Sequence, residues 1–369
     1  MMEFIDIKKQ YQLYKKEIDL AIHEVLDQGN FIMGEQVRTL ESTLAQYTNT
    51  KHCITVSSGT DSLQIALMAL GVGFGDEVIT VPFTWISSTE VIGLVGATPV
   101  FVDIEDRTYN IDVEQLEKAI TPKTKAILPV SLFGQMPDYT AINEIAHKYG
   151  LPVIEDGAQS FGATQHGRKS CSVTTIGSTS FFPAKPLGCY GDGGALFTND
   201  DTLAAKMRAI RTHGGERRHH HTCLGMNGRL DTMQAAILLA KFPHFDQEAQ
   251  ARASIGHFYS QELAGYCVIP EIQAGNTHVY AQYTIRTPER DELAKYLQAK
   301  GVPTGIYYPK CVHEQPVFKP LGYARGSMPV AEKMADEVIS LPMHPWLTEE
   351  DQHHIINMIK EFCCAPAAC

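Results

Sequence analysis

A single lysine stands in an apolar, glycine-rich stretch near the middle of the chain. Residues 180–195 read SFFPAKPLGCYGDGGA, which predicts a short strand, Lys185 on a loop, and a second strand from Ala195 to Thr198. Because an ammonium group is costly to desolvate, a lysine between apolar segments is expected to have a lowered pKa, and its amine can form a Schiff base with a carbonyl compound. An isolated Lys-Pro pair is more often an ordinary surface loop, so this interpretation depends on what accompanies it.

An acidic residue and a candidate phosphate site accompany the lysine. Asp156 follows a strand predicted at Pro152 to Glu155, and Gln159 lies just beyond it. Upstream, the small residues from Ser57 to Thr60 join a buried strand, His52 to Val56, to a helix. A helix N-terminus in this position binds phosphate through its backbone N–H groups and its dipole, although a plain Ser/Thr cap is commoner for any one example.

The elements that must position these groups alternate between strand and helix. This alternation predicts an α/β fold whose mostly parallel sheet is covered by helices on both faces. Ligands of such sheets bind at the carboxyl ends of strands, where Asp156, Gln159 and Trp85 all lie. The rhythm fades after residue 245, which predicts a large domain at 1–245 with an N-terminal arm and a smaller C-terminal α/β domain at 246–369. Strands are expected at 52–56, 77–81, 98–102, 125–130, 152–155, 195–198, 279–286 and 303–308, and helices at 14–26, 35–47, 59–70, 87–95, 113–120, 139–149, 201–213, 230–242, 245–263, 289–299, 331–338 and 349–361.

Size, charge and cysteine usage exclude several classes of protein. The 369 residues suffice for both domains, and the formal charge of −11 argues against a nucleic-acid partner. Neither a signal segment nor an apolar run of membrane-spanning length is expected. The nine cysteines form no zinc-type pair, and three of them fall in a tail after Phe362 that is expected to fray, which favours reduced thiols in the cytoplasm. The run His219 to His221 favours a solvated loop over a metal site, so no metal is expected.

Together these groups match the needs of one cofactor. Pyridoxal phosphate requires a lysine that forms a Schiff base, an acidic partner for its pyridine nitrogen and a phosphate cradle. Lys185, Asp156 and the turn at Gly59 and Thr60 supply these, and Trp85 adds an aromatic ring.

Over nearly its whole length the chain resembles the DegT/DnrJ/EryC1/StrS family of sugar aminotransferases. The resemblance rests on residues 58–63 (SGTDSL), 155–162 (EDGAQSFG), 180–195 and 227–236 (NGRLDTMQAA). It implies the type I, aspartate-aminotransferase-like fold of pyridoxal-phosphate-dependent transferases and a homodimer with shared active sites. Within the family the chain looks most like the transaminases that act on UDP-2-acetamido-2-deoxy-3-oxo-glucuronate in bacterial surface-polysaccharide pathways, with L-glutamate as amino donor.

The same resemblance assigns a role to each candidate site residue. Lys185 holds the cofactor and then shuttles a proton between the substrate Cα and the cofactor C4′, while Asp156 keeps the pyridine nitrogen protonated. Trp85 stacks on the ring, and Gln159 meets the ring and its O3′ side. The remaining assignments are Gly59, Thr60 and Ser180 to the phosphate, Asn227 to the phosphate of the neighbouring subunit, and Arg229, Tyr308 and His313 to the sugar-nucleotide side.

The chain departs from the family pattern at three positions. Gly157 stands where alanine is usual and Ala184 where serine often precedes the lysine; both are small, so we expect the fit to be preserved. His313 matches the broader family, whereas the uronate-specific members vary there.

Three other functions stay open. The chain could aminate another UDP- or dTDP-linked 3-oxo or 4-oxo sugar. A deoxysugar dehydratase is disfavoured by Lys185, because that lineage has histidine there. A non-catalytic regulator that binds pyridoxal phosphate or a sugar nucleotide is the most distant alternative.

Overall fold

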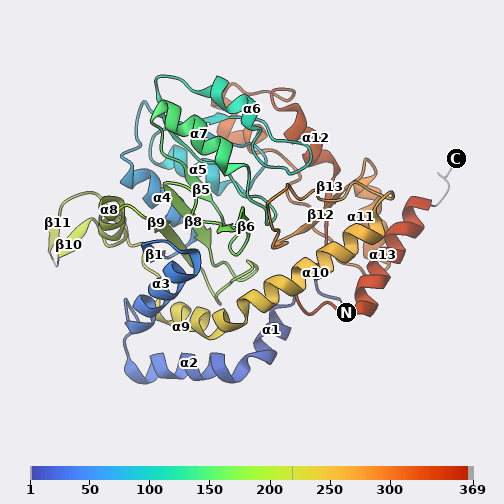
Figure 1. Cartoon of the computed structure of the whole chain (residues 1–369), viewed down its shortest axis with the longest axis horizontal. Coiled ribbons are helices and arrows are strands. Elements are labelled where there is room, and N and C mark those ends of the chain that lie inside the picture. The colour runs from blue at the N-terminus through green and yellow to red at the C-terminus, as the bar shows by residue number, and fades with distance from the viewer. Residues whose placement is uncertain (1, 218, 365–369) are drawn as a thin grey trace.

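The structure is a computed structural model that describes residues 2–217 and 219–364. Its core is one mixed sheet with strand order β3-β2-β4-β5-β8-β9-β1 (Figure 1), in which isolated parallel bridges join β4 to β5. The pairs β3-β2, β2-β4 and β5-β8 are parallel, whereas β9 runs antiparallel to both of its neighbours. The mostly parallel sheet predicted from the alternating pattern is therefore confirmed.

The described elements follow the predicted alternation, with short 3₁₀ turns between some of them. They are α1 (Ile7–Leu13), α2 (Lys15–Gln28), α3 (Glu35–Thr48), β1 (His52–Val56), α4 (Gly59–Ala69), β2 (Glu77–Thr80), α5 (Ser87–Leu94), β3 (Thr98–Phe101), α6 (Val113–Leu116), η1 (Glu117–Ala119), β4 (Thr124–Ile127), α7 (Tyr139–Tyr149), β5 (Ile154–Asp156), β6 (Thr164–Gln165), β7 (Arg168–Lys169), β8 (Ile176–Ser180), β9 (Gly194–Thr198), α8 (Asp201–Arg211), β10 (Gly215–Arg217), β11 (His220–His221), α9 (Thr232–Lys241), η2 (Phe242–His244), α10 (Phe245–Leu263), β12 (Tyr283–Arg286), α11 (Arg290–Ala299), η3 (Val312–Glu314), η4 (Pro316–Leu321), α12 (Pro329–Glu337), β13 (Val338–Leu341) and α13 (Glu349–Cys364).

Local chemistry explains where the helices near the sheet begin and end. The Ser58 side chain accepts a hydrogen bond from the Asp61 N–H and so caps the start of α4. The Asp138 carboxylate does the same for α7, and Gly150, in the left-handed conformation, ends that helix. Helix α4 then packs across β1, β5, β8 and β9, which fixes its N-terminus at one edge of the sheet.

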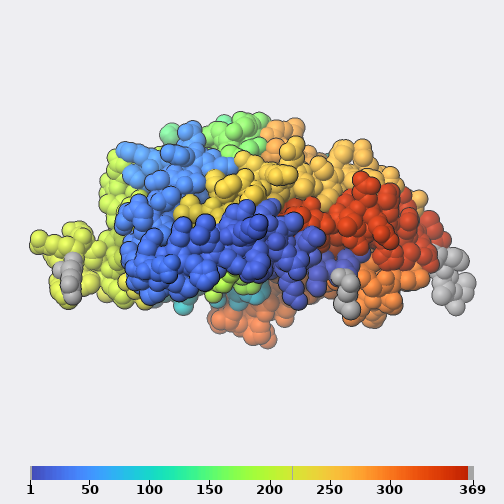
Figure 2. Space-filling model, turned by 90° about the horizontal axis from the view of Figure 1, so that it is seen from below, coloured from blue at the N-terminus to red at the C-terminus, as the bar shows by residue number. Residues whose placement is uncertain are grey.

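Sequence predictions differ from the structure most clearly in four segments. Residues 303–308 form no strand; Gly305 makes only a bridge to Ser340. The segment predicted to end a helix at Val338 instead continues as β13, which pairs with β12. His220 and His221 belong to a β10–β11 hairpin that projects from the body in Figures 1 and 2, not to an irregular loop. The predicted frayed tail is helical through Cys364, and residues 365–369 lie outside the described part of the chain.

The core divides among several apolar clusters. One gathers residues from α10 to α13, with Tyr259 and Ile355 fully buried. Another packs Cys311 and Phe318 against Phe101 and neighbouring strand residues of the N-terminal half. The predicted boundary at residue 245 stays a prediction, because part of the chain beyond it completes the core of the part before it.

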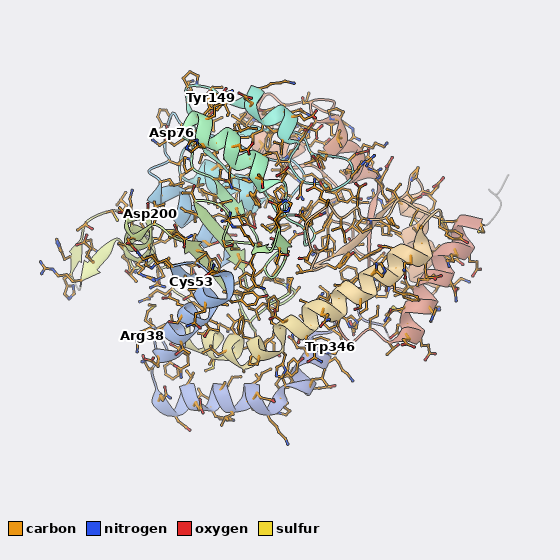
Figure 3. The ribbon with its side chains drawn as sticks, in the orientation of Figure 1. Arg38, Cys53, Asp76, Tyr149, Asp200 and Trp346 are labelled. Atoms are coloured by element: carbon orange, nitrogen blue, oxygen red, sulfur yellow. The ribbon has the colours of Figure 1, made fainter. Side chains whose placement is uncertain are left out.

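Part of the exterior is formed by elements near the two ends of the chain. Helices α1 and α2 cover one surface beside α10 and α13 (Figure 2), whereas Cys53 of β1 lies in the interior between α3 and α8 (Figure 3). Among the described residues, no helix is both long enough and apolar enough to cross a membrane.

Candidate active site

Lys185 lies on the loop between β8 and β9. The base of this loop is closed, because the Phe181 N–H donates to the Gly193 carbonyl at 2.7 Å and the Cys189 N–H donates to the Phe181 carbonyl at 2.8 Å. Burial lowers the pKa of the Lys185 ammonium, and the negative charge of Asp156 partly opposes this shift. The lowered pKa favours the neutral amine, which is the nucleophilic form.

Asp156 ends β5 and is 6% exposed. Each of its carboxylate oxygens has a protein donor: the Ser88 hydroxyl donates to Oδ2 at 2.7 Å, and the Ala158 N–H donates to Oδ1 at 3.1 Å. A carboxylate with hydrogen bonds from both sides is held in one orientation and still has lone pairs for another donor. The structure therefore brings together the predicted lysine and acid, whose charges interact.

The candidate phosphate cradle forms where α4 meets the end of β8. A Cβ atom on Gly59 would lie 2.7 Å from the Cβ of Ser180, so only glycine allows this approach. Ser58 uses the Asp61 N–H as its capping partner, which leaves the N–H groups of Gly59 and Thr60 at the positive end of the helix. Small backbone groups and the Ser180 hydroxyl thus converge in the way that an anion requires.

Gln159, Tyr308 and Trp85 form the third part of the site. The Gln159 side chain accepts from the Phe133 N–H at 2.7 Å and donates to the Tyr308 hydroxyl at 3.1 Å. The Tyr308 and Trp85 ring centroids are 6.2 Å apart, and Trp85 is 60% exposed. An exposed indole beside a fixed amide can stack on a planar ligand.

The other predicted site residues lie in different surroundings. Asn227 is exposed and accepts from Arg229 Nε at 2.9 Å, and the carbonyl of Gly228 between them accepts from the Ser57 N–H at 3.0 Å. His313 is 1% exposed, and its Nε2 lies 3.1 Å from Glu332 Oε1. A direct contact between His313 and substrate would require the side chain to leave this pocket, so its predicted role stays untested.

Sequence analysis missed two serines at the start of α5. Ser88 contacts Asp156, and Ser87 Oγ lies 2.9 Å from Thr60 Oγ1 in the phosphate cradle. Consecutive hydroxyl residues at the start of a helix resemble an ordinary N-cap. The one sequence signal for a functional role was their position directly after Trp85, in the segment that follows a predicted strand.

Gly157 was expected to preserve the fit as a small residue, and the structure shows in addition how little room there is for the usual alanine. A Cβ atom there would lie 2.8 Å from Cys171 Sγ and 3.0 Å from Ser170 Oγ. Cys171 occupies the space that an alanine methyl group would need, so an alanine here would force the Cys171 side chain or the nearby backbone to shift.

The fold and site define a transaminase of the pyridoxal-phosphate-dependent α/β class. The chain belongs to the DegT/DnrJ/EryC1/StrS aminotransferase family, whose model matches residues 12–360. It is similar to the UDP-2-acetamido-2-deoxy-3-oxo-D-glucuronate aminotransferase of Pseudomonas aeruginosa, with 52% identity over 94% of this chain and 96% of that protein. It is also similar to a protein of Geobacillus stearothermophilus named pleiotropic regulatory protein, with 48% identity over 97% of each chain.

Solved structures agree in fold. DesV from S. venezuelae, in complex with a ketimine intermediate, matches with a TM-score of 0.97 and 38% identity over 99% of each chain. NtdA from Bacillus subtilis, with bound cofactor PMP, matches with a TM-score of 0.90 and 32% identity over 95% of this chain and 82% of that one.

Proposed function

We propose that this protein transfers the amino group of L-glutamate to a nucleotide-linked keto-sugar, with UDP-2-acetamido-2-deoxy-3-oxo-glucuronate as the acceptor. The observation that carries the proposal is the pairing of a half-buried lysine of lowered pKa with the fixed carboxylate of Asp156. The Pseudomonas aeruginosa relative supports the choice of acceptor. The product would be a 3-amino sugar for surface-polysaccharide biosynthesis in the cytoplasm, made by a homodimer in which Asn227 reaches the partner's phosphate site.

The residues fit pyridoxal phosphate as the cofactor. The N–H groups of Gly59 and Thr60 at the start of α4 and the adjacent Ser180 hydroxyl are suited to hold a phosphate, and the exposed Trp85 ring could stack on the cofactor. When bound, this cofactor supplies an electron sink for the negative charge that develops at the donor's α-carbon.

The side chains of the protein supply proton transfer, cofactor binding and substrate binding. The neutral amine of Lys185 accepts the proton from the donor's α-carbon, as a general base, and returns a proton as a general acid. With the cofactor bound, the Asp156 carboxylate would keep the ring nitrogen protonated, and Gln159, fixed by Phe133 and Tyr308, would contact the ring on its O3′ side. Arg229, Tyr308 and His313 are proposed to shape the sugar-nucleotide side.

The test is an assay of the purified protein with glutamate and a panel of UDP- and dTDP-linked 3-oxo and 4-oxo sugars. We expect 2-oxoglutarate to form with the UDP-linked 3-oxo uronate and more slowly with the other sugars. Faster conversion of a dTDP-linked or 4-oxo sugar would transfer the proposal to that acceptor.

A regulator is the second candidate, favoured by the name of the Geobacillus stearothermophilus relative. A pure sensor would bind the sugar nucleotide without consuming glutamate. Binding measured by calorimetry, with no 2-oxoglutarate formed from any sugar of the panel, would favour the sensor over the transaminase.

A further inference from the structure

The start of α5 contains a buried hydroxyl group, that of Ser88, which contacts the Asp156 carboxylate. Ser88 is 0% exposed, and its Oγ lies 2.7 Å from Asp156 Oδ2. The alternative acceptor for its proton, the Trp85 carbonyl, is 3.5 Å away, so the short contact to the carboxylate takes the proton. Thr84 Oγ1, 3.3 Å from Ser88 Oγ, can donate to the serine in turn.

We propose that Ser88 is a positioning residue that holds the Asp156 carboxylate in the orientation needed to bind the protonated ring nitrogen of the cofactor. The inference rests on the proposed function and deepens it. With Ala158 on Oδ1 and Ser88 on Oδ2, rotation of the carboxylate breaks a hydrogen bond in either direction. Without the serine only the backbone donor remains, and the side chain has other orientations of similar energy.

The neighbouring residue gives this contact a second consequence. Ser87 bonds Thr60 at 2.9 Å, so adjacent residues of one helical turn contact the phosphate cradle and the acid. The first turn of α5 therefore links Thr60 of the candidate phosphate cradle to Asp156, the proposed partner of the ring nitrogen.

A purely structural serine would also be buried and hydrogen-bonded, so the test must read the ring nitrogen itself. The Ser88→Ala variant is loaded with pyridoxal phosphate carrying ¹⁵N in the ring. We expect its ¹⁵N resonance to move toward that of unprotonated pyridine, and kcat to fall about tenfold at unchanged KM, because a hydrogen bond to a charged group is lost. Ser88→Thr keeps the hydroxyl and should restore both values.

Thr89→Val provides the matched control. Thr89 is the next residue of α5, is 0% exposed, and its hydroxyl has no hydrogen-bond partner among the described residues. We expect this variant to leave the resonance and kcat unchanged.

An unchanged ¹⁵N resonance in Ser88→Ala overturns the inference, even if the melting temperature falls, because Ser88 would then serve packing alone. If Ser88→Thr does not fold, the ¹⁵N comparison of Ser88→Ala with wild type is sufficient to test the inference. A wild-type protein without turnover on any sugar refutes the proposed function instead, while the ¹⁵N comparison still reports on Ser88.

Discussion

The Cα of Gly59 lies so close to Ser180 that a Cβ added to the glycine would be 2.7 Å from the serine Cβ. This approach joins the N-terminus of α4 to the end of β8 and creates the candidate phosphate cradle. Relieving such an overlap requires backbone movement of the two elements that would hold the anion.

We expect Gly59→Ala to weaken cofactor binding by about tenfold or more, since accommodating a methyl group in a packed site costs about 1–3 kcal/mol. Titration of the apoprotein with pyridoxal phosphate measures this. Gly93→Ala is the control, because a Cβ there meets nothing within 4 Å. Equal affinities for Gly59→Ala and wild type would exclude a phosphate site at this turn.

Lys185→Ala should remove the cofactor's visible absorption band and lower kcat by about three orders of magnitude, because the group that moves protons is lost. Lys169→Ala is the matched control: burial also lowers the pKa of Lys169, but its amine packs over the Tyr47 ring, 3.8 Å from the centroid. Normal turnover of the Lys185 variant would disprove the mechanism.

Asp156→Asn should retain the cofactor and lose about a hundredfold or more in kcat, because a neutral amide no longer stabilises the proton on the ring nitrogen. Absorption spectra check the loading, and steady-state kinetics with glutamate check the rate. Identical rates for variant and wild type would remove Asp156 from the mechanism.

Glu155 faces away from Asp156 and should make stability depend on pH. Burial raises the pKa of its carboxyl from 4.5 to about 7, although the Ser170 hydroxyl and the Cys171 N–H donate to it at 2.6 and 2.7 Å. The folded protein therefore binds the proton more tightly than the unfolded chain. The resulting stabilisation, about 3 kcal/mol, is complete below pH 4.5 and is lost as pH rises through 7.

Glu155→Gln should abolish this component of the pH dependence, since the amide mimics the protonated acid. Chemical denaturation of the apoprotein at pH 5 and pH 8 measures the effect. We expect wild type to lose more stability than the variant between these values; equal losses would show that Glu155 stays ionised in the fold.

Gly157→Ala should destabilise the fold by about 1–3 kcal/mol through its overlap with Cys171 Sγ. Cys171→Ala removes that sulfur and should recover part of the loss in the double variant. A double-mutant cycle of denaturation free energies measures the coupling. Additive effects would mean that the two side chains do not compete for space.

Sequence patterns predicted elements best where periodicity and caps coincided. The limits of α7 match because Asp138 caps its start and Gly150 ends it, and those of β1 and α10 match the predicted apolar segments. β13 was missed since its fully buried residues follow α12 with no helix-breaking residue between them. Residues 303–308 were predicted as a strand, yet among the described residues only Gly305 of this segment pairs, with Ser340, and pairing across 35 residues is a tertiary property.

Within the site, residue type and position identified Lys185, on a loop flanked by apolar residues, and Asp156, at the end of a strand. Ser88 escaped notice because its role depends on which strand end faces α5, and that arrangement exists only after folding. His313 was predicted as a site residue from its family position, but folding buries its imidazole against Glu332.

The antiparallel pairing of β9 with β8 places both ends of the lysine-bearing loop beside the start of α4. Ser180, at the end of β8, pairs with Gly194, at the start of β9, and a Cβ on Gly194 would lie 2.5 Å from the Ser58 carbonyl oxygen. The lysine-bearing excursion thus departs from and rejoins the same edge of the sheet, beside the anion-binding turn. The ends of the lysine-bearing loop are thus held by backbone that also forms the candidate phosphate cradle. A substitution at Gly194 is therefore expected to displace both the lysine-bearing loop and the candidate phosphate cradle.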